Sequence, residues 1–105
     1  MQPKVSIIMP CYNAEEWVDA AINSALNQSY QNIEVIAVDN ESTDATKEII
    51  QNIQNKKLKI FSAENIYPFC WDEARSKGYE EAAGEYFFTL ASDDILSSSY
   101  IANCM

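Results

Sequence analysis

The sequence has no histidine and only two glycines among its 105 residues, and each shortage excludes a class of active site. Without histidine, catalysis by an imidazole acid or base is excluded. The two glycines, Gly78 and Gly84, cannot supply a G-x-G-x-x-G dinucleotide turn or a G-x-x-x-x-G-K-[ST] phosphate loop. The sequence therefore argues against a hydride-transfer enzyme and against a P-loop nucleotidase.

Basic residues are also scarce. Seven lysines and arginines stand against sixteen acidic residues, which gives a net charge of -9. Because nucleic-acid binding relies on basic patches, this balance argues against a nucleic-acid partner. An anionic ligand would need a metal ion or well-placed backbone amides.

Cysteines and long apolar runs are sparse as well. Cys11, Cys70 and Cys104 are odd in number and widely spaced, which is typical of reduced thiols in a cytosolic protein. No apolar run approaches the roughly 18 residues of a membrane span, and the first residues do not resemble a signal peptide. We expect a cytoplasmic protein, and peripheral attachment to the inner face of the membrane through residues outside this sequence stays open.

What the chain does contain is an alternation of apolar strand patterns and amphipathic helix patterns. Strands are expected at residues 5–9, 33–38, 58–62 and 86–91, and helices at residues 13–27, 43–53, 71–83 and from 95 onward. This order predicts an α/β fold with three layers, in which helices cover both faces of a mainly parallel, Rossmann-like sheet. The apolar run 86–91 indicates a strand buried on both faces. Gly78 should let the third helix approach the sheet closely.

Single residues are expected to set the first element boundaries. Pro10 should end the first strand because it cannot donate to a ladder. Asn13, with Glu16 three residues on, resembles a capping box for the first helix. Ser42 or Thr43 should cap the second helix.

Polar residues collect after the first, second and fourth strands, at ends that meet on one edge of a parallel sheet. They are Tyr12, Asn13, Asp39, Asp93 and Asp94. The adjacent carboxylates 93 and 94 repel each other, so a divalent cation shared with a substrate phosphate would suit them. Alternatively, Asp93 and Asp94 solvate a turn, Tyr12 shields a loop and Asp39 is a structural turn residue.

Five ordered segments resemble family-two glycosyltransferases. Residues 5–13 (VSIIMPCYN) end in that family's P-x-Y-N, and residues 36–44 (IAVDNESTD) are similar to its V-D-D-G-S-T-D. Residues 74–78, 83–86 and 93–94 resemble its A-R-N-x-G, A-x-G-E-Y and D-x-D-D segments. The match covers essentially the whole chain. It implies a GT-A fold and an enzyme that transfers a sugar, with inversion, from a nucleotide-diphosphate donor in the presence of Mn²⁺ or Mg²⁺.

The resemblance also implies roles for single residues. The nucleotide-sugar would be bound by Pro10, Tyr12, Asn13, Asp39, Arg75 and Asp93, and the metal by Asp94 together with Asp93. Tyr12 would lie against the base, and Asp39 would accept a ring N–H, which favours a UDP-sugar. Arg75 would fork onto the diphosphate; its alternative partner is a surface glutamate.

The sequence departs from the family pattern near these residues, and Ser76, beside Arg75, replaces asparagine. Ala91 replaces the first aspartate of D-x-D-D, so the metal site rests on two carboxylates. Asn40 and Glu41 replace aspartate and glycine, and the glutamate is expected to reshape the loop.

Trp17, Trp71 and Tyr67 are expected to pack in the core rather than line a sugar pocket.

Residues 1–105 resemble only the donor-binding half of such an enzyme, because the family's second half supplies the catalytic base and most acceptor contacts. We expect one truncated domain without a catalytic residue of its own, inactive alone and prone to self-association through an uncovered strand edge. The acceptor, whether a sugar, a polysaccharide or a lipid-linked glycan, cannot be read from these residues. The alternatives are a non-catalytic module that binds nucleotide or another protein, and an unrelated doubly wound signalling or nucleotidyl-transfer domain.

Overall fold

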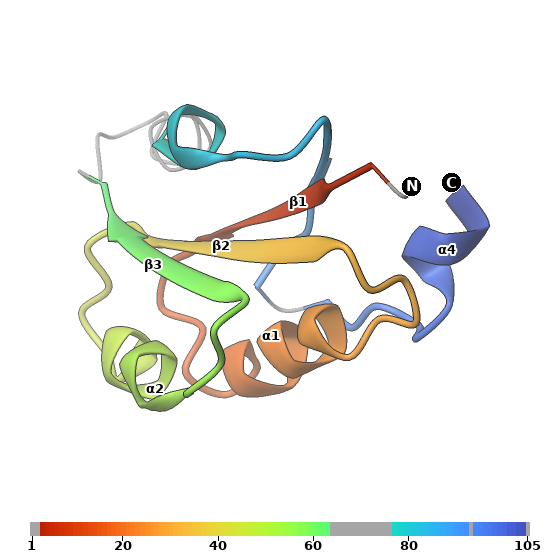
Figure 1. Cartoon of the computed structure of the whole chain (residues 1–105). Coiled ribbons are helices and arrows are strands. Elements are labelled where there is room, and N and C mark those ends of the chain that lie inside the picture. Colours follow the sequence, from red (N-terminus) through yellow and green to blue (C-terminus); the bar gives the residue numbers. More distant parts are fainter. Residues whose placement is uncertain (1–2, 64–76, 93, 105) are drawn as a thin grey trace.

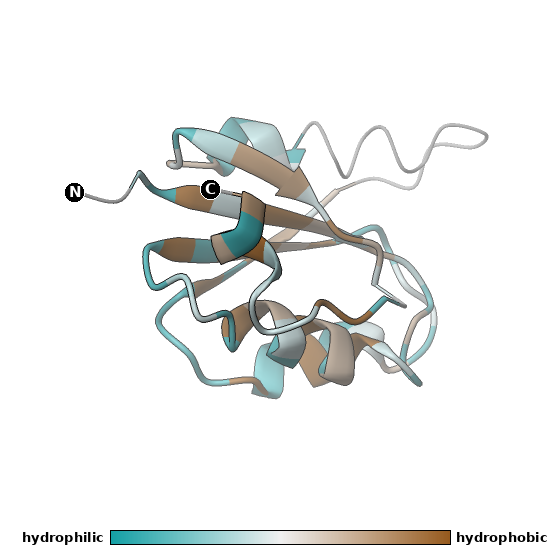
Figure 2. Ribbon diagram, turned by 90° about the vertical axis from the view of Figure 1, so that its right-hand side faces the viewer, coloured by the Kyte–Doolittle hydropathy of each residue, from teal (hydrophilic) through white to brown (hydrophobic). Residues whose placement is uncertain are grey.

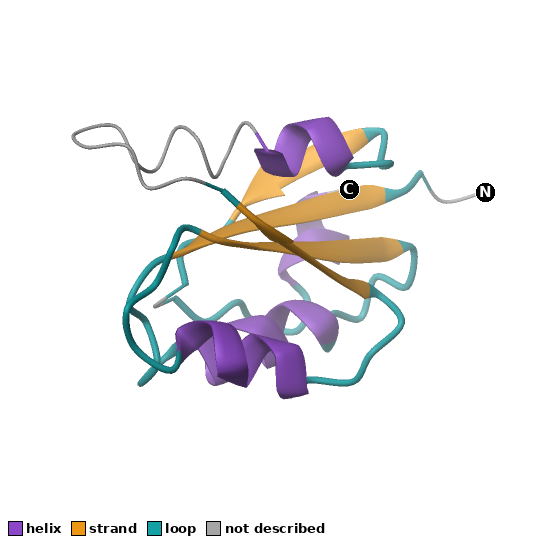
Figure 3. Ribbon diagram, turned by 90° about the vertical axis from the view of Figure 1, so that its left-hand side faces the viewer, coloured by secondary structure: helices purple, strands orange, loops and turns teal. Residues whose placement is uncertain are grey.

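Within the residues that the structure describes, four parallel strands form one twisted sheet (Figure 3). The structure is a computed structural model, and it describes residues 3–63, 77–92 and 94–104. The strands are β1 (Val5–Cys11), β2 (Ile33–Asp39), β3 (Leu58–Ser62) and β4 (Tyr86–Thr89). Their spatial order is β3-β2-β1-β4, so the two most apolar strands lie at the centre.

Helices lie on both sides of this sheet (Figure 1). Helices α1 (Val18–Leu26) and α2 (Thr46–Asn52) cover one face, and the helical residues 77–81 lie over the other. A short helix, α4 (Tyr100–Cys104), packs near the start of the chain. The expected three-layer α/β arrangement is confirmed. No helix in the described ranges is long and apolar enough to cross a membrane.

The side chains of β1 and β2 alternate between two apolar layers, as the period of a strand requires. Ile7 and Val35 face α1 and α2 in the larger layer, whereas Ile8 and Ile36 belong to the smaller layer on the opposite face. Figure 2 shows hydrophobic colouring along the strands of the sheet and in bands on the helices beside it. Burial on both faces explains why both strands read as nearly continuous apolar runs.

Pro10 lies inside β1, so the expectation that it ends the strand is wrong. It pairs with Val38 in the register between β1 and β2. The Ile8 carbonyl accepts from Leu90 N–H, whereas the Cys11 carbonyl accepts from Asn40 N–H beyond β2. By alternation, the nitrogen of Pro10 faces the β4 side, where the pairing has already stopped at Thr89. A missing donor costs no ladder bond at that position.

The helix boundaries also differ from the expectations. Helix α1 begins at Val18 with no side-chain cap, so Asn13 and Glu16 do not form a capping box. Helix α2 begins at Thr46, and the Thr46 N–H donates to the Asp44 carboxylate instead of to Ser42 or Thr43. The described part of the third helix ends at 81, and the last helix begins at Tyr100 rather than near 95.

Strand β4 is an edge strand, and the expectation that it is buried on both faces is wrong. Tyr86 is 53% exposed and Phe87 is 50% exposed. Phe87 contacts the Tyr79 ring edge-on, with 5.5 Å between centroids, and Phe88 packs against the core beside Tyr100. The aromatic run therefore reflects strand propensity and partial packing, while no described strand pairs with the outer edge of β4.

Both glycines lie where the backbone passes close to the sheet. A Cβ at Gly78 would overlap the Ile8 Cγ2 methyl, which confirms the expected close approach of the helical residues 77–81. A Cβ at Gly84 would lie 2.8 Å from the Ser6 nitrogen and 2.9 Å from the Lys4 carbonyl oxygen. A side chain at Gly78 would have to displace Ile8, and one at Gly84 would have to displace the backbone of residues 4 and 6.

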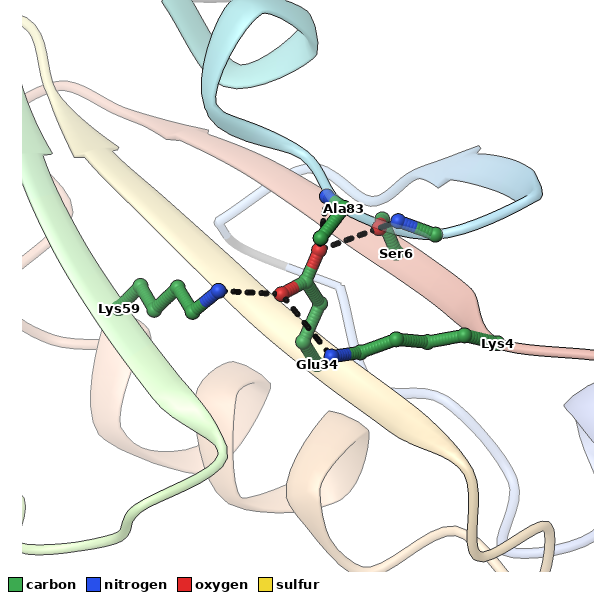
Figure 4. A network of polar contacts seen from close by, with 6 residues as sticks. Lys4, Ser6, Glu34, Lys59 and Ala83 are labelled. Atoms are coloured by element: carbon green, nitrogen blue, oxygen red, sulfur yellow. Dashed lines mark hydrogen bonds and ion pairs between the residues drawn. The ribbon is translucent and has the colours of Figure 1, made fainter.

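A buried glutamate fastens the segment before β4 to the sheet (Figure 4). Glu34 Oε2 accepts from Ser6 Oγ at 2.6 Å and from the Ala83 N–H at 2.7 Å. Glu34 Oε1 lies 2.8 Å from Lys59 Nζ and 3.7 Å from Lys4 Nζ. This one carboxylate thus connects β1, β2 and β3 with Ala83, in the segment that precedes β4.

The hydrogen bonds and the nearby charge keep Glu34 ionised. Burial alone would raise the pKa of the carboxyl group. Hydrogen bonds from Lys59, Ser6 and Ala83, together with the positive charge of Lys59, instead lower the pKa of Glu34 to about 2.

Candidate functional site

The candidate site lies at the carboxyl edge of the sheet, where the loops after β1 and β2 meet and toward which β4 also runs. Cys11 pairs with Asp39, so Tyr12 and Asn40 leave the sheet side by side. Thr89 pairs with Ile8, and the residues after β4 therefore pass along the same edge. The three strands thus end toward one edge of the sheet, as expected, and Tyr12 and Asp39 lie together there.

Asp39 ends β2 and is only 3% exposed. Its Oδ2 accepts from the Ser42 N–H at 3.3 Å. Its Oδ1 is buried and has no hydrogen-bond partner among the described residues. A buried carboxylate oxygen without a donor is unfavourable, so this atom is suited to a ligand that brings a donor.

Cys11 lies next to Asp39 across the β1–β2 register. Its thiol is fully buried and contacts the Met9 carbonyl oxygen at 3.3 Å. Burial, and then the negative charge of Asp39, raise the pKa of Cys11 well above its ordinary value. The thiol is therefore neutral and unreactive, and it packs in the apolar core beneath this edge.

Asn13 connects the loop after β1 to the loop after β2. Its backbone N–H donates to Ser42 Oγ at 3.1 Å. Its side-chain Oδ1 accepts from the Thr43 N–H at 2.7 Å and lies 3.3 Å from Thr43 Oγ1. Asn13 therefore makes contacts with two consecutive residues of the second loop.

Further contacts continue this connection toward the two helices. Ala14 N–H donates to Thr46 Oγ1 at 2.8 Å, and Glu15 N–H donates to Asp44 Oδ2 at 3.3 Å. Burial would raise the pKa of Asp44, but donors from Thr46 and Glu15 bring it below its ordinary value. We call the contacts of residues 13–15 with residues 42–46 the loop clamp.

Two non-glycine residues in these loops have a left-handed backbone. Asn13 has φ 46° and Glu41 has φ 55°. Asparagine tolerates this conformation, whereas glutamate is disfavoured in it. Glu41 was expected to reshape this loop. Instead, it adopts the left-handed conformation that glycine favours, so the turn is kept.

Of the other predicted site residues, three lie within the described part of the chain. Tyr12 is half-buried at the edge, Pro10 is buried within β1, and Asp94 is exposed with its N–H bonded to the Ala91 carbonyl at 3.1 Å. Arg75 and Asp93 lie outside the described residues.

The tryptophans were expected in the core. Trp17 is 49% exposed, so that expectation is wrong for it. Trp71 and Tyr67 lie outside the described ranges, where the expectation is not tested.

The described residues contain no group of three or more histidine, cysteine or acidic side chains close enough to hold a metal ion. The exposed carboxylate of Asp94 offers one hard oxygen donor at the edge. One or two carboxylates suffice for Mg²⁺ when substrate phosphates and water complete its shell. The donor chemistry thus fits a metal held jointly by the protein and a phosphorylated ligand.

Sequence reasoning missed the loop clamp and the Glu34 network. Asn13 and Asp44 look like ordinary capping residues, and their long-range partners depend on the β1–β2 register. Glu34 carried a clear signal, since it is the one charged residue inside the apolar run 33–38 and so required partners.

Comparisons with known proteins agree with this geometry. Residues 6–105 match the sequence profile of glycosyl transferase family 2. An uncharacterized glycosyltransferase of Haemophilus influenzae is 48% identical over 91% of the chain. The Escherichia coli UDP-Glc:alpha-D-GlcNAc-diphosphoundecaprenol beta-1,3-glucosyltransferase WfaP is 39% identical over 94% of the chain. The chain spans only 38% and 39% of the lengths of these two relatives.

Solved structures show the same fold. Staphylococcus aureus TarS 1-349 in complex with UDP superposes with a TM-score of 0.82 at 28% identity, over 96% of this chain and 30% of that one. A mannosyltransferase of Pyrobaculum calidifontis, in complex with GDP-Man and Mn²⁺, gives a TM-score of 0.77 at 22% identity, over 90% and 29%. At that lower identity the likeness concerns the fold alone.

Proposed function

Because this chain belongs to glycosyltransferase family 2, we propose that it forms the donor-binding half of an inverting glycosyltransferase that uses a UDP-sugar. The observation that carries the proposal is the buried Oδ1 of Asp39 at the carboxyl edge of the sheet, which has no hydrogen-bond partner within the described part of the chain. Uracil presents a ring N–H, which is the donor that this oxygen lacks. The structural likeness to TarS with bound UDP supports the same assignment.

Each candidate residue has a definite part in this proposal. Asp39 accepts the N–H of the base, and the half-buried Tyr12 supplies a flat apolar face for the ring. Pro10 stiffens the strand that leads to Tyr12. Arg75, the only arginine, pairs with the diphosphate, and Asp93 contacts the ribose or the hydration shell of the metal.

We further propose that Asp94, together with Asp93, holds Mn²⁺ or Mg²⁺ in company with the donor's phosphates. The proposal rests on hard carboxylate donors in a chain of net charge -9, which cannot attract a diphosphate by itself. When bound, a divalent cation stabilises negative charge on the departing nucleoside diphosphate. The residues of this chain bind and orient the donor and supply no general base.

The named relatives suggest an acceptor and a cellular location for the whole protein. The E. coli relative is named for an acceptor linked to diphosphoundecaprenol. We propose a lipid-linked acceptor for the whole protein and a cytoplasmic location peripheral to the inner face of the membrane.

We also propose that residues 1–105 constitute one domain half that does not transfer sugar alone and that associates with another copy through β4. The exposed Tyr86 and Phe87 at the outer edge of the sheet support this association.

The assignment of Asp39 can be tested by exchanging its chemistry. UDP should bind more tightly than CDP, because cytosine has no ring N–H at the corresponding position. In Asp39→Asn, the amide can still accept from Ser42 through its oxygen while its NH₂ faces the base. We therefore expect UDP binding to fall by about tenfold or more, since one charge-assisted hydrogen bond is worth about 1.5–3 kcal/mol. CDP should bind as well as before or better.

Isothermal calorimetry with Mn²⁺ present measures both affinities. Asp19→Asn, which makes the same change at an exposed position on α1, is the matched control. Equal binding of UDP and CDP by the unsubstituted protein would leave Asp39 as a structural turn residue. No binding of either nucleotide would contradict the proposed function.

A further inference from the structure

We propose that Asn13 is a positioning residue: it locks the loop after β1 to the loop after β2, and so fixes Asp39 for the nucleotide without itself touching it. The inference rests on the proposed function, because it concerns the same site. It differs from the role that the family resemblance implies, which places Asn13 among the residues that contact the donor.

The side-chain oxygen of Asn13 is already committed within the protein. It accepts from the Thr43 N–H at 2.7 Å and from Thr43 Oγ1 at 3.3 Å. In the opposite direction, Asn13 N–H donates to Ser42 Oγ at 3.1 Å. These two-way contacts extend the pairing of β1 and β2 beyond the last paired residues, Cys11 and Asp39.

Ser42 transmits this connection to Asp39. Its Oγ accepts from Asn13, while its own N–H donates to Asp39 Oδ2 at 3.3 Å. That donation occupies one carboxylate oxygen and leaves Oδ1 buried, with no donor from any residue that the structure describes. The orientation of Asp39 therefore depends on where Ser42 lies. The backbone N–H of Asn13 holds Ser42 directly, and the Asn13 side chain holds it through the next residue, Thr43.

The backbone of Asn13 explains why few residues can take its place. At φ 46°, asparagine, aspartate and glycine are tolerated, and other residues are strained. Aspartate keeps an oxygen that can accept both Thr43 hydrogen bonds. Glycine keeps the conformation but loses the acceptor, so the pair separates the effect of the clamp from that of the backbone.

The same pair separates positioning from direct contact. If Asn13 touched the nucleotide, it would do so by donating from its amide NH₂, because its oxygen is occupied. Asn13→Asp removes that donor and adds a negative charge near an anionic ligand. A direct contact therefore predicts that aspartate is as harmful as glycine, whereas positioning predicts that aspartate largely rescues binding.

The test measures UDP and CDP affinities by calorimetry with Mn²⁺ for the unsubstituted protein, Asn13→Gly and Asn13→Asp. Asn27→Gly, at the exposed C-cap of α1, is the control for replacing a surface asparagine. We expect Asn13→Gly to lose about tenfold in UDP affinity, in keeping with the net worth of one or two hydrogen bonds, and to lose much of the UDP preference. Asn13→Asp should stay within about threefold of the original affinity.

A second readout needs no nucleotide. Amide hydrogen exchange of Thr43 should speed up in Asn13→Gly and stay slow in Asn13→Asp, because the Thr43 N–H loses its acceptor only in the first. If the unsubstituted protein does not bind UDP, the proposed function fails, while Thr43 exchange still decides whether the clamp exists. Unchanged Thr43 exchange in Asn13→Gly, undiminished UDP binding by that variant, or equal losses in both variants would each overturn the inference.

Discussion

Replacing Glu34 by glutamine should destabilise the fold in a way that depends on pH. The side chain of Glu34 is 2% exposed, and its oxygens are bonded by Ser6, Ala83 and Lys59. Glutamine keeps the shape and one acceptor oxygen. Its NH₂ group, however, would face the Lys59 ammonium group. Both groups are hydrogen-bond donors, so the contact would be unfavourable.

The magnitude follows from the pKa of Glu34, which is lowered from 4.5 to about 2. This difference corresponds to about 3 kcal/mol of stability contributed by the ionised carboxylate. Because the folded-state pKa is lowered, the contribution is fully present above the unfolded value of 4.5 and is lost as pH falls toward 2. Glu34→Gln should therefore lower the free energy of unfolding by about 3 kcal/mol at pH 7 and by much less near pH 2.

Urea unfolding followed by far-UV circular dichroism at several pH values between 2 and 7 measures this difference. Glu48→Gln removes the same charge from an exposed position on α2 and serves as the control. A loss at pH 7 no larger than that of the control would refute the reasoning, as would a loss of the same size at pH 2.5 and pH 7.

Three further predictions concern packing, metal binding and association. Gly78→Ala should destabilise the fold by about 1–2 kcal/mol in the same unfolding assay, because the overlap with Ile8 outweighs the gain of about 1 kcal/mol in helix propensity; a stabilised variant would contradict this. UDP should bind more weakly when EDTA replaces Mn²⁺ in calorimetry, and Asp94→Asn should remove most of that difference; equal affinities would remove the argument for a shared metal. Light scattering should show association that rises with concentration and is reduced by Phe87→Lys at the exposed edge of β4; a monodisperse monomer would exclude it.

The sequence predicted those parts of the fold that depend on local patterns. Strands β1 and β2 are rich in β-branched residues and buried on both faces, so their positions followed from composition. The placement of Asp39 at the carboxyl edge followed from the end of the second apolar run. These features need only the periodicity of a strand and the parallel connection of β-α-β units.

The errors arose where long-range contacts decide the outcome. Pro10 is tolerated inside β1 because β4 stops pairing at Thr89, which no local pattern reveals. Asn13 resembles a helix cap, but its side chain bonds to Thr43, thirty residues away. The apolar run at 86–89 predicts burial, although its edge position in the sheet leaves Tyr86 and Phe87 half exposed.

The central claim is that a uridine nucleotide binds at the carboxyl edge of the sheet, with Asp39 as the acceptor for its base. Titration of UDP and Mn²⁺ into isotopically labelled protein, followed through backbone amide chemical shifts, tests it most directly. The account predicts that the largest shifts occur at residues 12–13, 39–43 and 91–94. Residues 31–34, at the amino-terminal end of β2, should stay unchanged. Saturable shifts confined to other surfaces, or no shifts at millimolar UDP, would contradict it.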